Sequence, residues 1–576
     1  MHTRFFRLTA AATASLALLG SCASLSTFAP DLTATAPRLE GYGRSNIMVT
    51  SRSPRAIQLF NEAVLQAYAF NDEEAVRTFK AALAQDRQCA MCAWGVAWQL
   101  GPIINNHSRD KTAEAVKYVD YALRNLAGAT PRERALVESL ALRYAHASTV
   151  RETAPLTDKI CGKKEEGKTH PLDIAYAERM RKLADAYPAD ADILSLYAEA
   201  EMIATEGDDQ WDKAGKPAGL IGEVTQRLER LLATQTDHIG LNHYLIHAVD
   251  AVSVAPRAVA AADRLGKLAP RSPHLLHMPA HTYVNVGRYA DAVRVNDAAV
   301  AADVAFTEDL KVQGFSPTAD WRGHNLSFMW YAAIMAGNED GAMATADRLR
   351  DRARSDRTFT EFFRTLRLVT LVRMEQWDKV LLEPKPRGEK GMADAWYEHA
   401  RGVAHARLGQ LDEARAALPR LQAGAARIRA DNAASDSFEK MLRSIVDVAE
   451  FGLQAEIALA SRNYDEALAH QAKAVKAAEK LDAREPPVLA DGTKLKLGYI
   501  QGRAGKWKEA ETTYREALAD HPASGWALRG LAQALQAQGR QADAEAVRRE
   551  LARAWQSVPA GLKTVTDARP SQTPPA

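Results

Sequence analysis

The chain has 576 residues, of which 47% are hydrophobic and 25% are charged, and its formal net charge at pH 7 is +2. This composition is that of an ordinary soluble globular protein and excludes collagen-like, disordered and polytopic membrane chains. The near-neutral charge gives no electrostatic case for binding nucleic acid. Four cysteines are too few to staple a fold of this size with disulfides.

Residues 1–21 have the pattern of an export signal. A basic start precedes an apolar run over residues 8–19, which is too short to span a bilayer. The run ends in Leu-Gly-Ser-Cys at residues 19–22, which resembles a bacterial lipobox. That resemblance implies acylation of Cys22, with membrane contact through this lipid anchor only, and Ala23 implies an outer-membrane lipoprotein facing the periplasm. The alternative is an ordinary cleaved signal peptide, and both interpretations predict export.

The rest of the chain divides by composition. Residues 22–46 are rich in Ser, Thr, Ala and Pro and are predicted to form a linker, and residues 557–576 are predicted to be a disordered tail. Between them we expect an irregular helical array over residues 47–383 and a more regular one over residues 395–556. The stretch 384–394, which holds two prolines and two glycines, is the expected joint.

Between the tails, apolar residues recur with helical spacing and no run predicts a strand. One segment near the C-terminus fits the 34-residue tetratricopeptide repeat (TPR) pattern of small, aromatic and proline positions, at Gly498, Gly505, Trp507, Ala510, Tyr514, Ala517 and Pro522. A single helix pair cannot bury its own apolar face, so such pairs stack into a solenoid with a concave side. The sequence therefore predicts an all-α, TPR-type right-handed solenoid of about ten helix pairs.

Two histidine pairs recur in this repeat frame. His243 and His247 fall at positions 5 and 9 of one repeat, and His277 and His281 fall at the same positions of the next. Side chains four residues apart stack on one helix face, and two neutral imidazoles with this spacing can chelate one metal ion. Neighbouring helices lie about 10 Å apart, so we expect both pairs to reach a common point.

Further candidate ligands surround the pairs. His274 and His324 each fall at position 2 of a repeat, Glu199 falls at position 9 of the preceding repeat, and Asp250 and His238 flank the first pair. In TPR proteins positions 2, 5 and 9 line the concave groove, so the resemblance implies that these side chains share one wall.

More than four histidines exceed what one tetrahedral ion needs. The excess favours either a dinuclear site or additional histidines that orient ligands or act in catalysis. All-imidazole ligation suits divalent zinc, copper, iron or nickel without choosing among them, and Glu199 would make a mixed histidine and carboxylate site. The alternatives are histidines that recognise a polar peptide in the groove and a chance recurrence.

Pro279 lies between His277 and His281. A proline inside a helix removes a backbone hydrogen bond and kinks the helix, at about 3 kcal/mol. That cost beside three histidines indicates a shaped site. The alternative is a helix that begins near Met278, which would loosen the pairing of the two histidines.

Cys89 and Cys92 are predicted to begin a helix. In an exported protein a structural disulfide is the first expectation. The alternatives are a redox pair, activated by the helix N-terminus, and a copper site that includes Met91. Cys161 is left as an odd thiol that could pair with either cysteine.

Two tryptophans follow the cysteines. Trp94 and Trp98 fall at positions 5 and 9 of their repeat, so the frame predicts that they form an apolar wall of the groove. Packing in the hydrophobic core is the equal alternative.

Three blocks together resemble a group of bacterial exported TPR proteins. They are Cys-Ala-Met-Cys-Ala-Trp-Gly at residues 89–95, Asn-His-Tyr-Leu-Ile-His-Ala-Val at residues 242–249 and His-Leu-Leu-His-Met-Pro-Ala-His at residues 274–281. The resemblance covers residues 55–345, and Asp250 departs from it because the group often has Glu there. It implies the fold and the joint occurrence of these motifs, and it does not imply a reaction.

The sequence supports three hypotheses and leaves open whether the protein is an enzyme. In the first, the two histidine pairs bind metal and His274, His324 or Glu199 completes the coordination or acts as a general base. In the second, the groove is a scaffold for a peptide or protein partner in the cell envelope, with Trp94 and Trp98 as anchors. In the third, the site stores or delivers metal without turnover. The regular array after residue 395 is expected to dock the partner.

Overall fold

The computed structural model describes residues 28–556 apart from 105, 145–168, 206–209, 318–319, 356–357, 431–436, 482–485 and 490–491. The export signal, Cys22, Cys161 and the C-terminal tail predicted from the sequence lie outside the described residues. The described part folds as an all-α, TPR-type helical solenoid, and its only extended pairings are two isolated β-bridges. Among the described residues, no helix is both long enough and apolar enough to cross a membrane.

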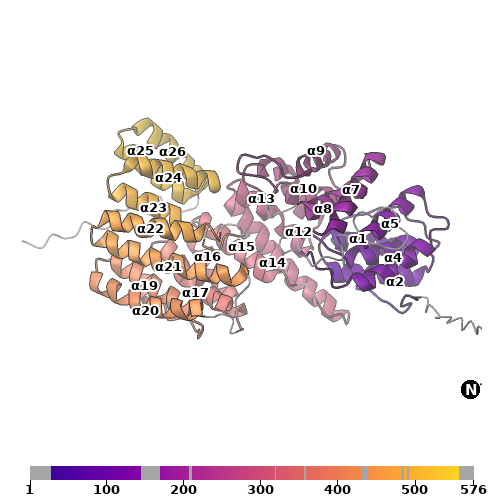
Figure 1. Cartoon of the computed structure of the whole chain (residues 1–576), viewed down its shortest axis with the longest axis horizontal. Coiled ribbons are helices and arrows are strands. Elements are labelled where there is room, and N and C mark those ends of the chain that lie inside the picture. Colours follow the sequence, from indigo (N-terminus) through magenta and orange to yellow (C-terminus); the bar gives the residue numbers. More distant parts are fainter. Residues whose placement is uncertain are drawn as a thin grey trace, which may run out of the picture.

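The N-terminal half is a series of helix pairs, drawn in indigo to magenta on the right of Figure 1. Successive helices pack against each other, as the repeat pattern predicts. Its elements are α1 (Pro54–Tyr68), α2 (Asp72–Gln85), α3 (Ala90–Gln99), α4 (Thr112–Arg124), α5 (Pro131–Arg143), α7 (Pro171–Ala186), α8 (Ala191–Ala204), α9 (Ile221–Leu232), α10 (Ile239–Ala248), η1 (Ala255–Ala258), α11 (Val259–Leu268), α12 (Pro273–His277) and α13 (Pro279–Asn285).

The long helix α14 links this half to a second array, drawn in orange and yellow on the left of Figure 1. The stretch 384–394 is the loop between α18 and α19 together with the first residues of α19. The elements are α14 (Tyr289–Val312), α15 (Arg322–Met335), α16 (Glu339–Arg352), α17 (Thr358–Arg373), α18 (Trp377–Leu382), α19 (Met392–Arg407), α20 (Leu411–Ala430), α21 (Ser437–Ala460), α22 (Tyr464–Ala478), α23 (Gly492–Arg503), α24 (Trp507–Asp520), α25 (Gly525–Ala537) and α26 (Gln541–Ala554).

Local sequence explains where the helices begin and end. The side chains of Thr130 and Glu133 cap the start of α5 reciprocally, and Pro131 occupies its first position, where no backbone N–H is needed. Hairpins close on glycines in the left-handed region, such as Gly287 (φ 78°) and Gly337 (φ 66°), because a side chain there is strained.

Two large hydrophobic cores run along the array and meet at α14 and α15, since both helices contribute buried residues to each core. On α14, Phe306 belongs to the first core and Val300 to the second. On α15, Phe328 belongs to the first and Trp330 to the second. Helices α14 and α15 therefore join the two halves through packing as well as through the chain.

The C-terminal hairpin returns to the middle of the molecule. The indole N–H of Trp526 donates to the carbonyl of Ile334 (2.9 Å), and that of Trp555 donates to the carbonyl of Met335 (3.1 Å), at the end of α15. Both indoles are buried, and their rings pack edge to face at 4.7 Å. The second array thus curls until its last hairpin covers the end of α15.

Residues 28–46 contain no helix, and part of this segment lies against the N-terminal array. The ring of Phe28 packs edge to face on Tyr118, with centroids 4.9 Å apart. Tyr42 is buried in the first core, and the backbone N–H of Arg38 donates to the side chain of Gln313 (2.8 Å). The described part of the predicted linker is therefore attached to the solenoid at several points.

Candidate metal centre

Six histidines from α10, α12, α13 and α15 meet as two groups of three. The first triad consists of His243 and His247 on α10 and His274 on α12. Within it, the Nε2 atom of His243 lies 3.1 Å from Nε2 of His247 and 3.1 Å from Nε2 of His274. One nitrogen from each ring lies within 4.8 Å of the other two, so the three rings face a common point.

The second triad repeats this arrangement one helix further along. It consists of His277 on α12, His281 on α13 and His324 on α15. The Nε2 atom of His277 lies 2.9 Å from that of His281 and 3.0 Å from that of His324. Helix α12 therefore gives one ligand to each triad, with His274 and His277 three residues apart.

The helix is interrupted between His277 and His281. Helix α12 ends at His277 and α13 begins at Pro279, so the proline occupies the first position of a new helix and its missing N–H costs no helical bond. Met278, between the two, keeps right-handed helical angles (φ −50°, ψ −37°). The helix thus starts anew near Met278, as one alternative predicted, while the histidines stay paired.

Two polar side chains bond to the Nδ1 atoms of the second triad, on the side of each ring opposite Nε2. Asn296 donates its amide N–H to the carbonyl of Ala292, so its oxygen is the atom that accepts from Nδ1 of His277 (2.7 Å). Asp250, a carboxylate and hence an acceptor, lies 2.7 Å from Nδ1 of His281. Both rings therefore carry their proton on Nδ1, and in the neutral rings both Nε2 atoms present lone pairs.

These protonation states create a conflict that a cation resolves. Two lone pairs that face each other at 2.9 Å, on His277 and His281, repel unless a proton or a metal ion lies between them. Burial, followed by the neighbouring histidines, holds the pKa of His277 well below its usual value. The same causes lower the pKa of His243 and His274. The protein thus disfavours the proton and leaves the nitrogens available as metal ligands.

One phenylalanine covers each triad. The ring of Phe328 lies 4.5 to 5.1 Å from the three rings of the second triad. The ring of Phe70 lies 4.7 to 5.5 Å from those of the first. Most of the site is buried, and His247 and His324 alone among the six are partly exposed. The site therefore meets solvent at these two rings.

Phe70, which packs on the first triad, has an unfavourable backbone conformation. Its φ of 53° is left-handed, and it occupies the turn position that Gly287 and Gly337 take in other hairpins. A bulky residue in this region costs about 1–3 kcal/mol. Phe70 combines this strain with contacts to the three rings of the first triad. A phenylalanine at a turn position that glycine often takes is the sequence signal that could have singled it out.

Glu199 does not reach either triad. Its carboxylate is buried, accepts from the indole N–H of Trp98 (3.0 Å) and from the hydroxyl of Tyr244 (3.2 Å), and has a pKa raised by burial. Tyr244 in turn stacks on His243, with centroids 5.4 Å apart. Glu199 therefore belongs to the layer behind the first triad, because α8 is one helix pair further from the site.

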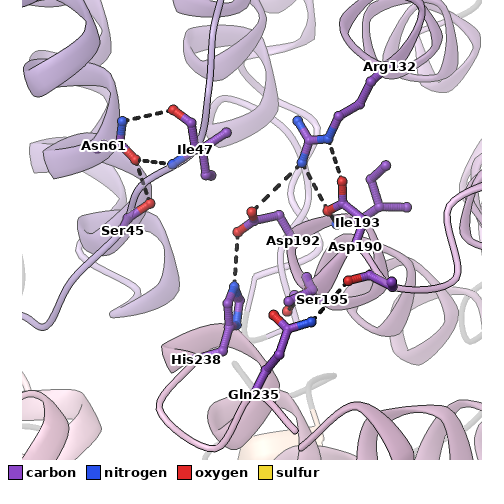
Figure 2. Close-up of polar contacts among 12 residues, drawn as sticks. Ser45, Ile47, Asn61, Arg132, Asp190, Asp192, Ile193, Ser195, Gln235 and His238 are labelled. Atoms are coloured by element: carbon purple, nitrogen blue, oxygen red, sulfur yellow. Dashed lines mark hydrogen bonds and ion pairs between the residues drawn. The ribbon is translucent and has the colours of Figure 1, made fainter.

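His238 also stays outside the triads. It is the N-cap of α10, where its Nδ1 accepts from the backbone of Leu241, and its Nε2 lies 3.1 Å from Asp192. Figure 2 shows this pair beside Arg132, whose guanidinium bonds to Asp190. The ring of His238 therefore bonds to the start of its own helix and to Asp192.

The tryptophans and cysteines form part of the first core. Trp94 and Trp98 are 3% and 1% exposed and stack on each other at 5.3 Å, so neither is accessible to a partner as an anchor. Cys89 and Cys92 form a disulfide at the start of α3. The disulfide is the first expectation for the two cysteines, and core packing is one of the two equal interpretations of the tryptophans.

The fold and the site together define an all-α, TPR-type repeat protein with two adjacent histidine triads. No family model matches the chain, and no curated protein matches it. Solved structures that are similar include the human IFIT1 dimer with m7Gppp-AAAA (12% identity, 88% of this chain and 91% of that one, TM-score 0.28). Others are yeast Tom70 (12%, 88% and 86%, 0.21) and the TPR domain of P58(IPK) (10%, 84% and 98%, 0.19). The likeness extends to the fold alone.

Proposed function

We propose that this protein binds transition-metal ions through its two histidine triads. The observation that carries the proposal is the contact between Nε2 of His277 and Nε2 of His281, at 2.9 Å, while Nδ1 of each ring is held by Asn296 or Asp250. Histidines that bind metal are oriented in this way, with the second nitrogen bonded to an amide, carbonyl or carboxylate.

Three imidazoles leave coordination positions free on an ion such as zinc, copper or iron. Catalytic metal sites keep such positions for water or substrate, whereas structural sites close them with a fourth protein ligand. None of the carboxylates in the described part of the chain joins either triad. Three imidazoles are a ligand set that catalytic zinc sites use, so each triad supports a reactive metal centre.

The test is the metal content of the full chain, purified without a polyhistidine tag. We expect bound transition metal in the wild type and its loss in the double variant His243→Ala, His277→Ala, which removes the central ring of each triad. The matched control is His238→Ala, since His238 caps the start of α10, the helix that carries His243, but lies outside the triads. A wild type that binds no zinc, copper or iron in titrations would refute the proposal.

We propose in addition that the protein is an exported lipoprotein anchored through Cys22. Support comes from the lipobox-like residues 19–22 and from the disulfide of Cys89 and Cys92, which suits an oxidising compartment. Labelling of cells with a radioactive fatty acid should mark the wild type and leave Cys22→Ser unmarked. Labelling of both proteins, or of neither, would refute the lipid anchor.

A scaffold for an envelope protein is the second candidate function. A helical-repeat solenoid presents extended surfaces to partners, and α14 exposes Val304 (53%) and Val312 (77%) to solvent. A partner would use such surfaces rather than Trp94 or Trp98. Crosslinking in intact cells should then capture the same partner with the wild type and with the double histidine variant, whereas a partner that depends on the metal site would be lost.

A further inference from the structure

The N-terminal segment meets the first triad at residues 41–43, which read Gly-Tyr-Gly. Three elements surround that triad: α10 and α12 carry its histidines, and the turn at Phe70 places a ring against all three of them. Each of the three consecutive residues lies against a different one of these elements. The segment whose composition predicts a linker is therefore part of the surroundings of the site.

Gly41 packs on the loop that leads into α12. Its carbonyl accepts from the backbone N–H of Arg271 (3.1 Å), and Arg271 directly precedes Ser272, the N-cap of α12. A Cβ at Gly41 would lie 2.8 Å from Cγ of Arg271, and the φ of Gly41, 79°, is left-handed. Both the close approach and the backbone conformation therefore require glycine here. The contact holds the chain directly before the helix that carries His274.

Gly43 packs on the start of α10 in the same way. A Cβ at Gly43 would lie 2.8 Å from Cδ1 of Ile239, which is buried and is the first residue of α10, and the φ of Gly43 is 105°. His243 follows Ile239 by about one helical turn. A displacement of Ile239 is therefore passed along a rigid helix to a ligand of the first triad.

Tyr42, between the two glycines, is buried and reaches the turn at Phe70. Its ring packs on that of Phe306 of α14, with centroids 6.5 Å apart. Burial raises the pKa of the Tyr42 hydroxyl and the nearby side chain of Asn71 lowers it, which places Asn71 beside this hydroxyl. Asn71 is buried, directly follows Phe70, and donates its amide N–H to the side chain of Gln66 (2.9 Å). Tyr42 therefore supports the turn that covers the first triad.

We propose that residues 41–43 are a clamp that holds the ligands of the first triad in place for a metal ion, so that docking of the N-terminal segment controls the metal affinity of this triad. The inference rests on the metal-binding function proposed above. Ligands must be held to within about 0.5 Å of their binding geometry, and a segment that bridges their helices supplies that rigidity. Release of the clamp then lowers the affinity of the first triad.

The second triad depends less on the clamp. Two of its ligands lie on α13 and α15, and the third, His277, is bonded to Asn296 of α14. A loss of affinity confined to the first triad therefore separates the clamp from a general effect on the stability of the fold.

The experiment measures affinity for zinc, or for copper if the wild type takes up no zinc, in two versions of the full chain that each keep one triad. His281→Ala leaves the first triad intact, and His247→Ala leaves the second. We expect Tyr42→Ala and Gly43→Val to lower the affinity of the first triad about tenfold or more, and to change that of the second by less than about threefold.

Two further variants sharpen the comparison. Ser45→Ala is the matched control, since Ser45 lies on the same segment and donates to Asn61 of α1 (2.7 Å; Figure 2) rather than contacting an element of the triad. It should leave the affinity of both triads unchanged. Tyr42→Phe keeps the buried ring and should restore the affinity of the first triad to within about threefold of the wild type.

Other outcomes separate the two proposals. Equal losses at both triads, no loss at either, or a loss with Tyr42→Phe as large as with Tyr42→Ala would overturn the clamp and leave metal binding intact. A wild type that binds no zinc, copper or iron would defeat both. If a one-triad version fails to fold, the clamp variants are compared in the otherwise wild-type chain, where one of the two ions should bind more weakly.

Discussion

Replacement of Asp250 by Asn tests the second triad with the least change in shape. The carboxylate lies 2.7 Å from Nδ1 of His281 and accepts a further bond from the side chain of Asn285 (2.8 Å). The amide keeps the size and one acceptor, but it loses the negative charge. The bond to His281 then becomes a neutral one, and the imidazole becomes a weaker ligand.

The size of the effect follows from the geometry. Loss of a partner behind a metal-ligating histidine lowers affinity by about 10–100-fold, or about 1.4–2.8 kcal/mol. A hydrogen bond to a charged group contributes about 1.5–3 kcal/mol, which is the same range. Asp250 is 13% exposed, so solvent screens its charge only in part. We therefore expect Asp250→Asn to lower the affinity of the second triad for its metal ion by this factor.

Isothermal titration calorimetry with zinc, copper or iron measures the affinity of both triads. The protein is first stripped of metal by a chelator. The first triad should keep its affinity within about threefold, because Asp250 holds His281, a ring of the second triad. Asp192→Asn is the matched control, since that carboxylate also contacts a histidine, His238, outside the triads. An equal loss of affinity at both triads, or no loss at either, would refute the assignment of Asp250 to the second triad.

Three further predictions follow from the packing. Phe70→Gly relieves the left-handed strain but removes a buried ring, so the metal-free protein should lose about 2–4 kcal/mol in chemical denaturation; increased stability would contradict this. Trp555→Ala should cost about 3–5 kcal/mol and raise hydrogen exchange in α15; unchanged exchange there would mean that the C-terminal hairpin does not cover this helix. His399 has a pKa lowered by burial to about 4, so its contribution is complete above pH 6.5 and is lost as pH falls from 6.5 toward 4. His399→Gln should flatten the stability curve there by at most about 3 kcal/mol, and an unchanged slope would count against the shift.

The N-terminal part of the site shows where sequence reasoning stops. The repeat frame places Glu199 at a groove position, and Trp98 and Tyr244 instead bind its carboxylate behind the first triad. The frame also says nothing of Asn296, which lies on α14 and holds His277 from the neighbouring helix. The repeat period predicts which face of a helix a residue occupies. Which residues that face contacts depends on how the helices pack.

The sequence alone determined the helical class of this protein and singled out the six histidines that come together in the structure, since a 34-residue period and a spacing of four residues are properties of the chain itself. Tertiary packing decided that the histidines divide into two triads. The short helix α12 contributes to both, with His274 bonded to His243 of α10 and His277 bonded to His324 of α15. Tertiary packing also decided that the C-terminal hairpin returns to cover α15. Contacts between residues distant in the chain depend on the summed geometry of many helix pairs, which no local pattern encodes.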